Sequence, residues 1–320
     1  MKSRRLGRTG AMVSEIGYGA WGIGGSQWMG AQDDESLRAL HRAVDLGLNF
    51  IDTALAYGNG HSETLVGQLV RERKEEIYVA TKVPPANYEW PAARPVAEVF
   101  PAAHLRKSTE ASLENLAVER IDLLQLHVWL DAYLDEPWLR DELLGLKKAG
   151  KVRWLGVSIN DHAPHTALRA VASGLFDTVQ VIHNIYDQGP AAALYPACLA
   201  HDVGVIVRVP FDEGGLLGTI TPDTEFPKGD FRNHYFGGER KGEVHRRTQA
   251  LQQLLGDEAA TLPELALRYC LSHDAVSTVI PGMRRLSSVE ANVAVSDGRR
   301  LSPKLMEALR SHAWLRNFYD

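Results

Sequence analysis

Short apolar runs alternate with longer amphipathic segments along almost the whole chain, and this alternation constrains the fold more than any other feature. An unbroken alternation of strands and helices is typical of a parallel sheet. Eight such units in 320 residues favour a closed (β/α)8 barrel, or TIM barrel, over an open doubly wound sheet. The expected strands span residues 15–18, 49–52, 77–81, 121–126, 152–157, 178–182, 203–207 and 277–280.

The two ends of the chain and two long connections complete the expected architecture. A short hairpin pairing residues 4–6 with 12–14 precedes the first strand, and an extra C-terminal helix begins at Ser302. No break in composition divides the chain, so we expect a single domain over residues 1–320. The connections 84–101 and 211–241 are long, and such loops in a compact domain are usually functional or mobile.

Composition argues against several classes of protein. The net charge is −5 and no basic stripe stands out, so nucleic acid is not an expected partner. No apolar run approaches the roughly 20 residues that span a bilayer, and the basic start has no apolar segment of a signal peptide behind it. Cys198 and Cys270 lie far apart without metal-ligand spacing, as free thiols of a reducing cytosol do. We therefore expect a cytoplasmic protein, with no indication of its oligomeric state.

Polar side chains stand where three consecutive expected strands end. Asp52 ends the second strand, Lys82 follows the third and His127 follows the fourth, while Tyr57 lies in a glycine-rich turn five residues after Asp52. The carboxyl ends of barrel strands face one mouth, and neighbouring strands lie about 4.8 Å apart. Alone, the lysine would more often be a solvated charge and the histidine a structural one. Together, the four side chains are expected to converge.

Such a set suits proton transfer to a carbonyl oxygen while a hydride reaches the carbonyl carbon. A tyrosine has a pKa near 10, and a nearby ammonium is expected to lower the pKa of Tyr57 toward working pH. Asp52 would hold the ammonium in place, and His127 would hydrogen-bond a substrate oxygen. Metal-assisted hydrolysis is the alternative chemistry, but it needs several histidine or carboxylate ligands and only one rim histidine is present. No metal is expected.

Four motifs, in order, resemble those of the aldo-keto reductase superfamily: Phe-Ile-Asp-Thr-Ala-Leu-Ala-Tyr-Gly at 50–58, Ala-Thr-Lys at 80–82, Leu-Gln-Leu-His at 124–127 and Ile-Pro-Gly at 280–282. The resemblance covers essentially the whole chain. It implies an NADPH-dependent carbonyl reductase in which Tyr57 is the general acid/base, Lys82 and Asp52 perturb it, and His127 orients the carbonyl. Some members of the superfamily are regulatory, so a non-catalytic NADP-binding subunit is the alternative.

The resemblance also implies where the cofactor lies. Residues 17–22 fit a Gly-x-Gly-x-x-Gly pattern, but no helix pattern begins before Asp33, which argues against a Rossmann site. The resemblance places 19–21 against the nicotinamide instead. Ile159 separates a serine and an asparagine that are usually adjacent, which leaves open whether Ser158 or Asn160 holds the carboxamide.

Two further segments complete the expected cofactor site. Glycines after strand seven are typical of a phosphate site, with a plain loop as the alternative. Arg284 or Arg285 is expected to pair with a 2′-phosphate, which favours NADP over NAD, and Arg208 offers a guanidinium plane for stacking. The expected cofactor residues are Gly19, Ala20, Trp21, Asp52, Ser158, Asn160, Gln180, Arg208, Val209, Pro210, Phe211, Gly214, Gly215, Leu216, Gly218, Gly282, Met283, Arg284, Ser288 and Asn292.

The expected mouth loops are rich in aromatic residues, which predicts an apolar or sugar-like substrate face for a small carbonyl compound. The sequence does not decide whether the aromatic tail at 314–320 covers the mouth or packs beneath the helices. The expected substrate-binding residues are Trp21, Tyr57, Trp90, His127 and Trp129.

Overall fold

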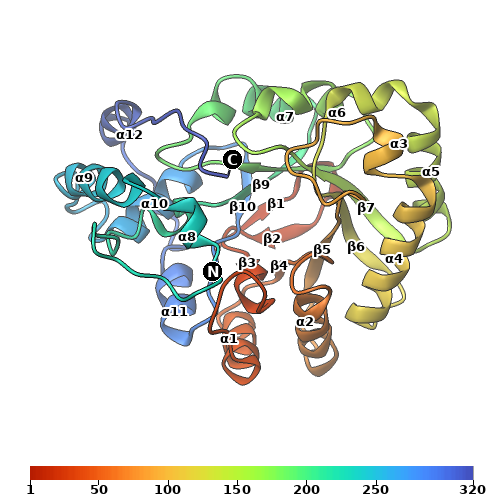
Figure 1. Cartoon of the computed structure of the whole chain (residues 1–320), viewed down its shortest axis with the longest axis horizontal. Helices are drawn as coiled ribbons and strands as arrows, with labels where there is room; N and C mark the ends of the chain where they lie inside the picture. Colours follow the sequence, from red (N-terminus) through yellow and green to blue (C-terminus); the bar gives the residue numbers. More distant parts are fainter. Residues whose placement is uncertain (320) are drawn as a thin grey trace.

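Eight parallel strands follow one another in chain order around a barrel, as the computed structural model of residues 1–319 shows (Figure 1). The strands are β3 (Tyr18–Gly19), β4 (Phe50–Asp52), β5 (Tyr78–Val83), β6 (Ile121–Leu126), β7 (Val152–Ser158), β8 (Thr178–Ile182), β9 (Gly204–Arg208) and β10 (Val276–Val279). Parallel bridges of Ile16 with Val279 and of Gly19 with Gly282 join the first strand segment to the last. The predicted (β/α)8 fold is confirmed.

The barrel closes at a point that only glycine permits. Gly17 N donates to Val279 O at 2.8 Å, and Gly19 N donates to Pro281 O at 3.0 Å. A Cβ at Gly19 would stand 2.6 Å from the carbonyl oxygen of Ile280, well inside van der Waals contact. The expected strand at 15–18 is therefore shorter and later than predicted, because residues 15–17 approach β10 only through isolated contacts.

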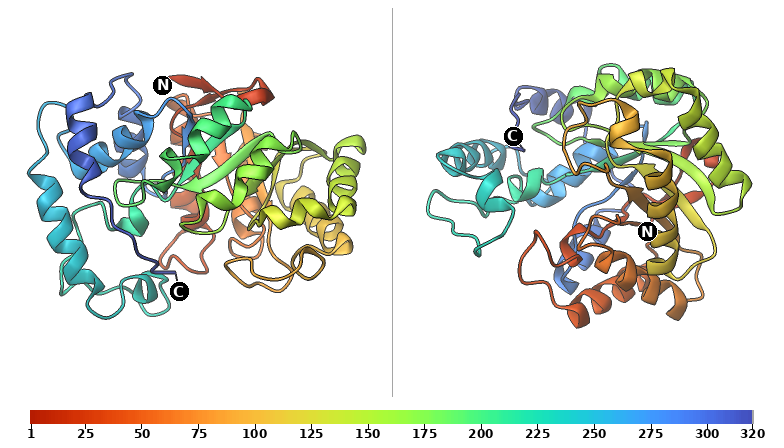
Figure 2. Two further views of the ribbon diagram at one scale, coloured as in Figure 1. Left: turned by 90° about the horizontal axis from the view of Figure 1, so that it is seen from above. Right: turned by 45° about the vertical axis from the view of Figure 1, so that its right-hand side comes forward.

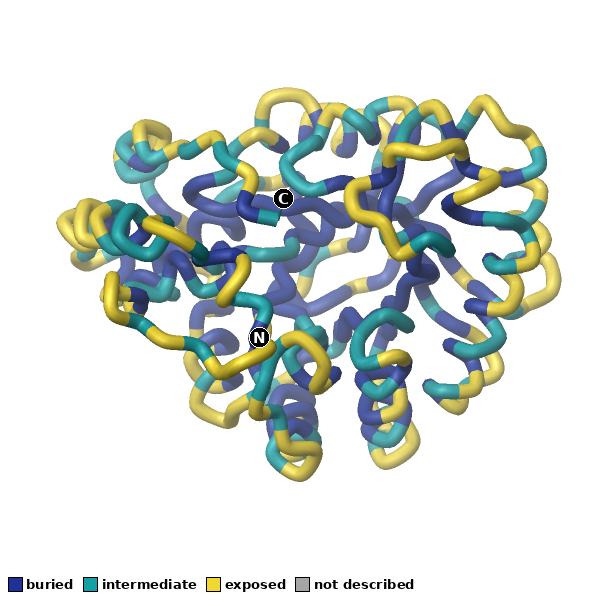
Figure 3. Tube along the Cα trace, in the orientation of Figure 1, coloured by how far each residue is buried: buried dark blue, intermediate teal, exposed yellow. Residues whose placement is uncertain are grey.

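Helices surround the barrel, and most follow a strand as predicted (Figures 1 and 2). Their buried faces and exposed outer faces are separated clearly in Figure 3. The helices are α1 (Asp33–Asp45), α2 (His61–Glu72), α3 (Val96–Val99), α4 (Ala102–Leu116), α5 (Pro137–Lys148), α6 (Leu168–Ala172), α7 (Leu194–Ala200), α8 (Arg232–Tyr235), α9 (Arg240–Gln252), α10 (Leu262–Leu271), α11 (Leu286–Ala294) and α12 (Pro303–Arg310). No helix among residues 1–319 is long and apolar enough to cross a membrane.

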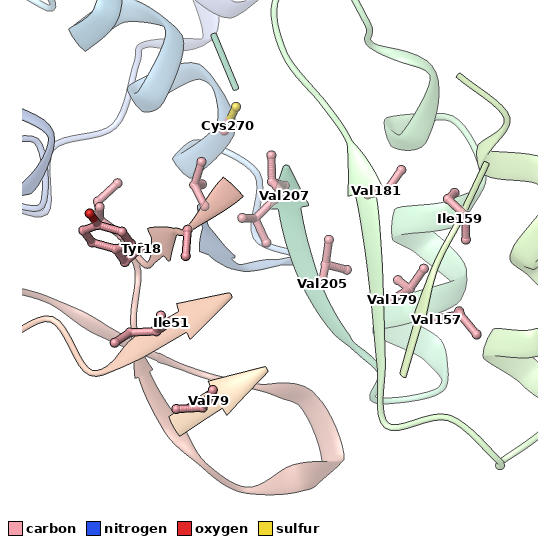
Figure 4. Packing of buried hydrophobic residues seen from close by; sticks show 14 of the residues in the cluster. Tyr18, Ile51, Val79, Val157, Ile159, Val179, Val181, Val205, Val207 and Cys270 are labelled. Atoms are coloured by element: carbon pink, nitrogen blue, oxygen red, sulfur yellow. The ribbon is translucent and has the colours of Figure 1, made fainter. Parts of the chain in front are cut away.

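The alternation of side chains along each strand divides the core into two layers. One set faces the helices and includes Ile51, Val79 and Val205, which are buried in the main hydrophobic cluster (Figure 4). The other set lies inside the barrel. It forms a separate buried cluster in which Phe50, Ala80, Leu123 and Ile206 meet residues of the N-terminal hairpin. The hairpin strands β1 (Ser3–Arg5) and β2 (Met12–Ser14) are antiparallel, as predicted.

Candidate active site

The strand period places the polar residues directly above the interior apolar layer. Asp52, Lys82, Gln125 and Arg208 each come two residues after a member of that layer, so they point to the same side of their strands. Lys82 is paired in register with Gln125 on β6. The predicted convergence at one mouth therefore follows from the barrel, because consecutive strands are neighbours and end at the same level.

The Lys82 ammonium stands at the centre of the site. Nζ donates to Asp52 Oδ2 at 2.6 Å, to the carbonyl oxygen of Thr53 at 2.8 Å and to Tyr57 Oη at 3.2 Å. The side chain of Lys82 is fully buried, and that of Asp52 is 3% exposed. A buried ammonium is tolerated only with such partners. Each of the three N–H groups of the ammonium has a hydrogen-bond acceptor, so these contacts fix the position of Nζ.

Two amides hold the other oxygen of the Asp52 carboxylate. Gln180 Nε2 donates to Oδ1 at 2.7 Å, and Gln125 Nε2 donates to the same atom at 3.2 Å. Gln180 is one of the expected cofactor residues, whereas Gln125 is not among the expected site residues. Its signal was a polar side chain within an apolar strand, two residues before His127 and therefore on the same face.

Glycines place Tyr57 over the ammonium. Gly58 and Gly60 have φ of 65° and 88°, which side chains rarely adopt. A Cβ on Gly58 would also stand 2.0 Å from the carbonyl oxygen of Gly24, so the two loops touch backbone to backbone. The Tyr57 ring stacks on Trp21 with centroids 6.1 Å apart and meets the edge of His127 at 5.7 Å. All four predicted catalytic side chains therefore lie together at the carboxyl ends of the strands.

Burial changes the electrostatics expected for the tyrosine. It raises the pKa of Tyr57 above 10, and the opposing effect of the Lys82 charge does not overcome it. The predicted lowering of this pKa is therefore wrong, because the surrounding protein displaces much of the water around the partly exposed Tyr57. The pKa of Lys82 is raised, since Asp52 and Tyr57 outweigh the cost of burial. Burial, with the Lys82 charge, holds the pKa of His127 well below 6.5, so its imidazole is neutral.

Aromatic side chains flank Tyr57 and His127 on two sides. Trp21 lies against Phe231 with ring centroids 5.3 Å apart, and Trp90 meets the edge of His127 at 5.8 Å. Trp129 is different and is a correction to the expected substrate site. It is fully buried, packs against Phe176 at 5.0 Å and donates through Nε1 to Asp131. The chain turns outward after β6, which sends this ring into the core behind the barrel.

The residues expected at the nicotinamide lie at the ends of β7, β8 and β9. Ser158 pairs in register with Gln180, whose Oε1 is buried without a protein partner. Asn160 uses both atoms of its amide on the backbone of Ala92, at 3.0 and 3.2 Å. Arg208 donates to Asp161 Oδ1 at 2.6 Å and to the carbonyl oxygen of Ile159 at 3.0 Å. The Ala92 contact occupies Asn160, which leaves Ser158 and Gln180 facing the site.

The segment from the last residue of β9 through the following turn, residues 208–218, is strained. Val209, Asp212 and Glu213 have φ of 55°, 52° and 54°, and Gly214 has φ of 104°. Positive φ is rare outside glycine, and most of all in a β-branched residue. Of the other expected residues here, Pro210, Gly215 and Leu216 are buried, while Phe211 and Gly218 are partly exposed. Strain of this kind persists only where surrounding contacts fix the backbone.

A cationic group follows β10. Arg284 donates to the carbonyl oxygen of Met29 at 2.9 Å, and its pKa is lowered by burial and by the neighbouring charges of Arg285 and Arg232. Asn292, one turn beyond the partly exposed Ser288, has a buried Nδ2 without a protein partner. Gly282 is exposed and Met283 is buried. Clustered guanidinium groups suit the phosphate end of a nucleotide.

A sequence model of the Aldo/keto reductase family matches residues 15–313. The chain therefore belongs to this family of oxidoreductases, which generally use nicotinamide cofactors. The NADH-specific methylglyoxal reductase of Escherichia coli (strain K12) is 30% identical over 311 residues, which cover 92% of this chain and 93% of that protein. A probable voltage-gated potassium channel subunit beta of Arabidopsis thaliana is 26% identical over 320 residues, covering 93% of this chain and 92% of that protein.

A solved structure shows the same likeness in three dimensions. The holo form of the aldo-keto reductase AKR11C1 from Bacillus halodurans superposes with a TM-score of 0.76 and 26% identity, covering 100% of both chains. Within residues 1–319, no group of three or more histidine, cysteine, aspartate or glutamate side chains is arranged to hold a metal ion.

Proposed function

We propose that this protein is an NADPH-dependent carbonyl reductase that reduces an aldehyde or ketone, or oxidises the corresponding alcohol in reverse. The observation that carries the proposal is the hydrogen-bonded chain from Asp52 through the Lys82 ammonium to the Tyr57 hydroxyl. A buried carboxylate, a buried cation and a phenol at one opening form a proton donor with a stabilised conjugate base. An aldehyde, ketone or sugar-like carbonyl would enter between Trp21 and Trp90.

In this mechanism the bound nicotinamide supplies the hydride, and the side chains of the protein handle the proton. The neutral imidazole of His127 orients the carbonyl oxygen toward the Tyr57 hydroxyl. Tyr57 Oη gives its proton to that oxygen as negative charge develops there. The Lys82 ammonium, already 3.2 Å from Oη, stabilises the phenolate that remains. Asp52 and its two glutamine donors keep the ammonium from moving.

The residues present fit a nicotinamide nucleotide. Ser158 and Gln180 would hold the carboxamide, since the Gln180 Oε1 lacks a protein partner. Arg284, Arg285 and Asn292 would hold the adenosine phosphate, which supports NADPH over NADH. Equilibrium binding of NADPH and NADH tests this choice. Equal affinities for the two nucleotides would contradict it, and so would an NADPH affinity that Arg285→Ala leaves unchanged.

The matched pair Tyr57→Phe and Tyr88→Phe tests the proposed acid. Tyr88 is exposed, and its ring meets Trp90 edge-on with centroids 6.0 Å apart. Tyr57→Phe should lose turnover with a panel of aldehydes by about 100-fold or more and still bind NADPH, while the Tyr88 variant keeps its activity. Normal reduction by Tyr57→Phe would refute the assignment. Nucleotide binding without turnover by the wild type would favour the alternative, a regulatory NADP-binding subunit.

The remaining features support a simple organisation. We propose one barrel domain over the whole chain and a cytoplasmic location, for which the buried free thiols of Cys198 and Cys270 are the supporting observation.

A further inference from the structure

We propose that the C-terminal segment 314–319, here called the tail latch, holds the β9 turn in its cofactor-binding conformation and that Arg316 neutralises Asp212 there. The inference rests on the proposed nucleotide site. It makes Arg316 and Tyr319 positioning residues, which act on the cofactor through the turn and do not contact the reacting atoms.

The first contact of the tail latch is a buried ion pair. Arg316 Nη2 binds Asp212 Oδ1, and the two side chains are 6% and 1% exposed. The Arg316 guanidinium also lies over the rings of Trp314 at 4.9 Å and Tyr186 at 5.6 Å. Tyr235 Oη donates to the same carboxylate oxygen at 3.0 Å. This set excludes water from the pair, so its charges act at close range with little screening.

The second contact is made by the end of the tail. Tyr319 Oη donates to Glu213 Oε1 at 2.6 Å, and its ring lies against Tyr235 and Phe231 with centroids 5.0 and 5.9 Å away. Phe318 is buried against the same loop, where Arg240 donates to its carbonyl oxygen at 3.2 Å. Tyr319 thus lies beside α8, which contains Tyr235. The tail therefore contacts both acidic residues of the turn.

The turn needs such contacts because it does not hold its shape by local preference. Asp212 and Glu213 both have positive φ, and a Cβ on Gly215 would stand 2.6 Å from Asp212 Oδ2. The backbone is thus wrapped around the Asp212 carboxylate. Without Arg316, that carboxylate would keep its buried position uncompensated, and the strained backbone would lose its anchor.

Electrostatics gives the ion pair its consequence for the cofactor. The glycine-rich turn of a barrel after this strand is a usual phosphate site, yet here it contains two carboxylates. An unpaired Asp212 would repel a pyrophosphate. Arg316 offsets the Asp212 charge from within the fold and so removes that repulsion.

The experiment compares Arg316→Met, Asp212→Asn, the double variant and Tyr319→Phe. The matched control is Arg310→Met, an arginine of α12 that is 74% exposed and forms an ion pair with Glu307 at 2.8 Å. NADPH affinity is measured by quenching of tryptophan fluorescence, and hydrogen exchange of residues 208–218 is measured without nucleotide. Arg316→Met should weaken NADPH binding about tenfold or more and speed exchange in the turn. Adding Asp212→Asn should restore most of the affinity.

Different results separate the latch from the proposed function. The inference would be overturned if Arg316→Met matched the Arg310→Met control in both NADPH affinity and hydrogen exchange. A double variant as weak as Arg316→Met would overturn the neutralising role of Arg316. If Arg316→Met fails to fold, hydrogen exchange of the turn is measured in Arg316→Lys and Tyr319→Phe instead. Exchange that is unchanged in both variants would overturn the proposed latch. A wild type that binds no nicotinamide nucleotide would refute the proposed function, while the exchange measurement still tests the latch.

Discussion

Removing the buried ammonium with Lys82→Met separates what this residue does for stability from what it does for catalysis. Methionine has nearly the same length, so little volume is lost, but Asp52 loses its charge partner at 2.6 Å while 3% exposed. Breaking one side of a buried ion pair costs about 3–5 kcal/mol. Gln125 and Gln180 still donate to Asp52, so we expect the low end, about 3 kcal/mol of unfolding free energy.

A double-mutant cycle with Asp52→Asn tests this reasoning. Each single variant leaves an uncompensated charge, whereas the double variant leaves none. The free energy of unfolding that the double variant loses should therefore be about 2 kcal/mol smaller than the sum of the losses in the two single variants. Urea denaturation, followed by far-UV circular dichroism, measures each free energy.

Activity should follow a different pattern in the same cycle. Reduction depends on the ammonium that stabilises the Tyr57 phenolate, so both Lys82→Met and the double variant should lose about 100-fold or more in turnover. Two results would refute the reasoning. One is a loss below about 1 kcal/mol in Lys82→Met. The other is activity regained in a double variant that still lacks the ammonium.

Two further predictions concern pH. Because the pKa of Tyr57 is raised and that of His127 is held well below 6.5, the acid is protonated and the imidazole neutral from pH 6.5 to 9. The steady-state kcat/KM for reduction should be flat over this range, and an inflection that His127→Gln abolishes would contradict it. Burial raises the pKa of Glu213 from 4.5 to about 7. This acid therefore stabilises the fold fully below pH 4.5 and loses that contribution as pH rises through 7. The free energy of unfolding of Glu213→Gln should exceed that of the wild type by up to about 3 kcal/mol at pH 8 and by almost nothing at pH 4. Denaturation measures both differences, and equal differences at the two pH values would contradict this prediction.

The barrel was predictable because its signals are local. The strands at 121–126 and 178–182 have the expected bounds, since a buried parallel strand shows as a continuous apolar run. The first strand was less predictable, because residues 15–17 contact β10 only through isolated bridges. The convergence of Asp52, Lys82 and His127 also followed from sequence, because each comes at the end of a consecutive strand.

The environment of those residues depended on tertiary structure. The sequence places an ammonium beside a phenol, but the loss of hydration around the partly exposed Tyr57 decides the sign of its pKa shift, and that loss is a sum over distant segments. The sequence position of Trp129, two residues after His127, predicts a mouth residue, yet its ring is fully buried in the main hydrophobic cluster. Likewise, the pairing of Arg316 with Asp212 joins positions 104 residues apart. Patterns along the chain determine which elements form, whereas charge neutralisation and exposure are decided only when remote side chains share one space.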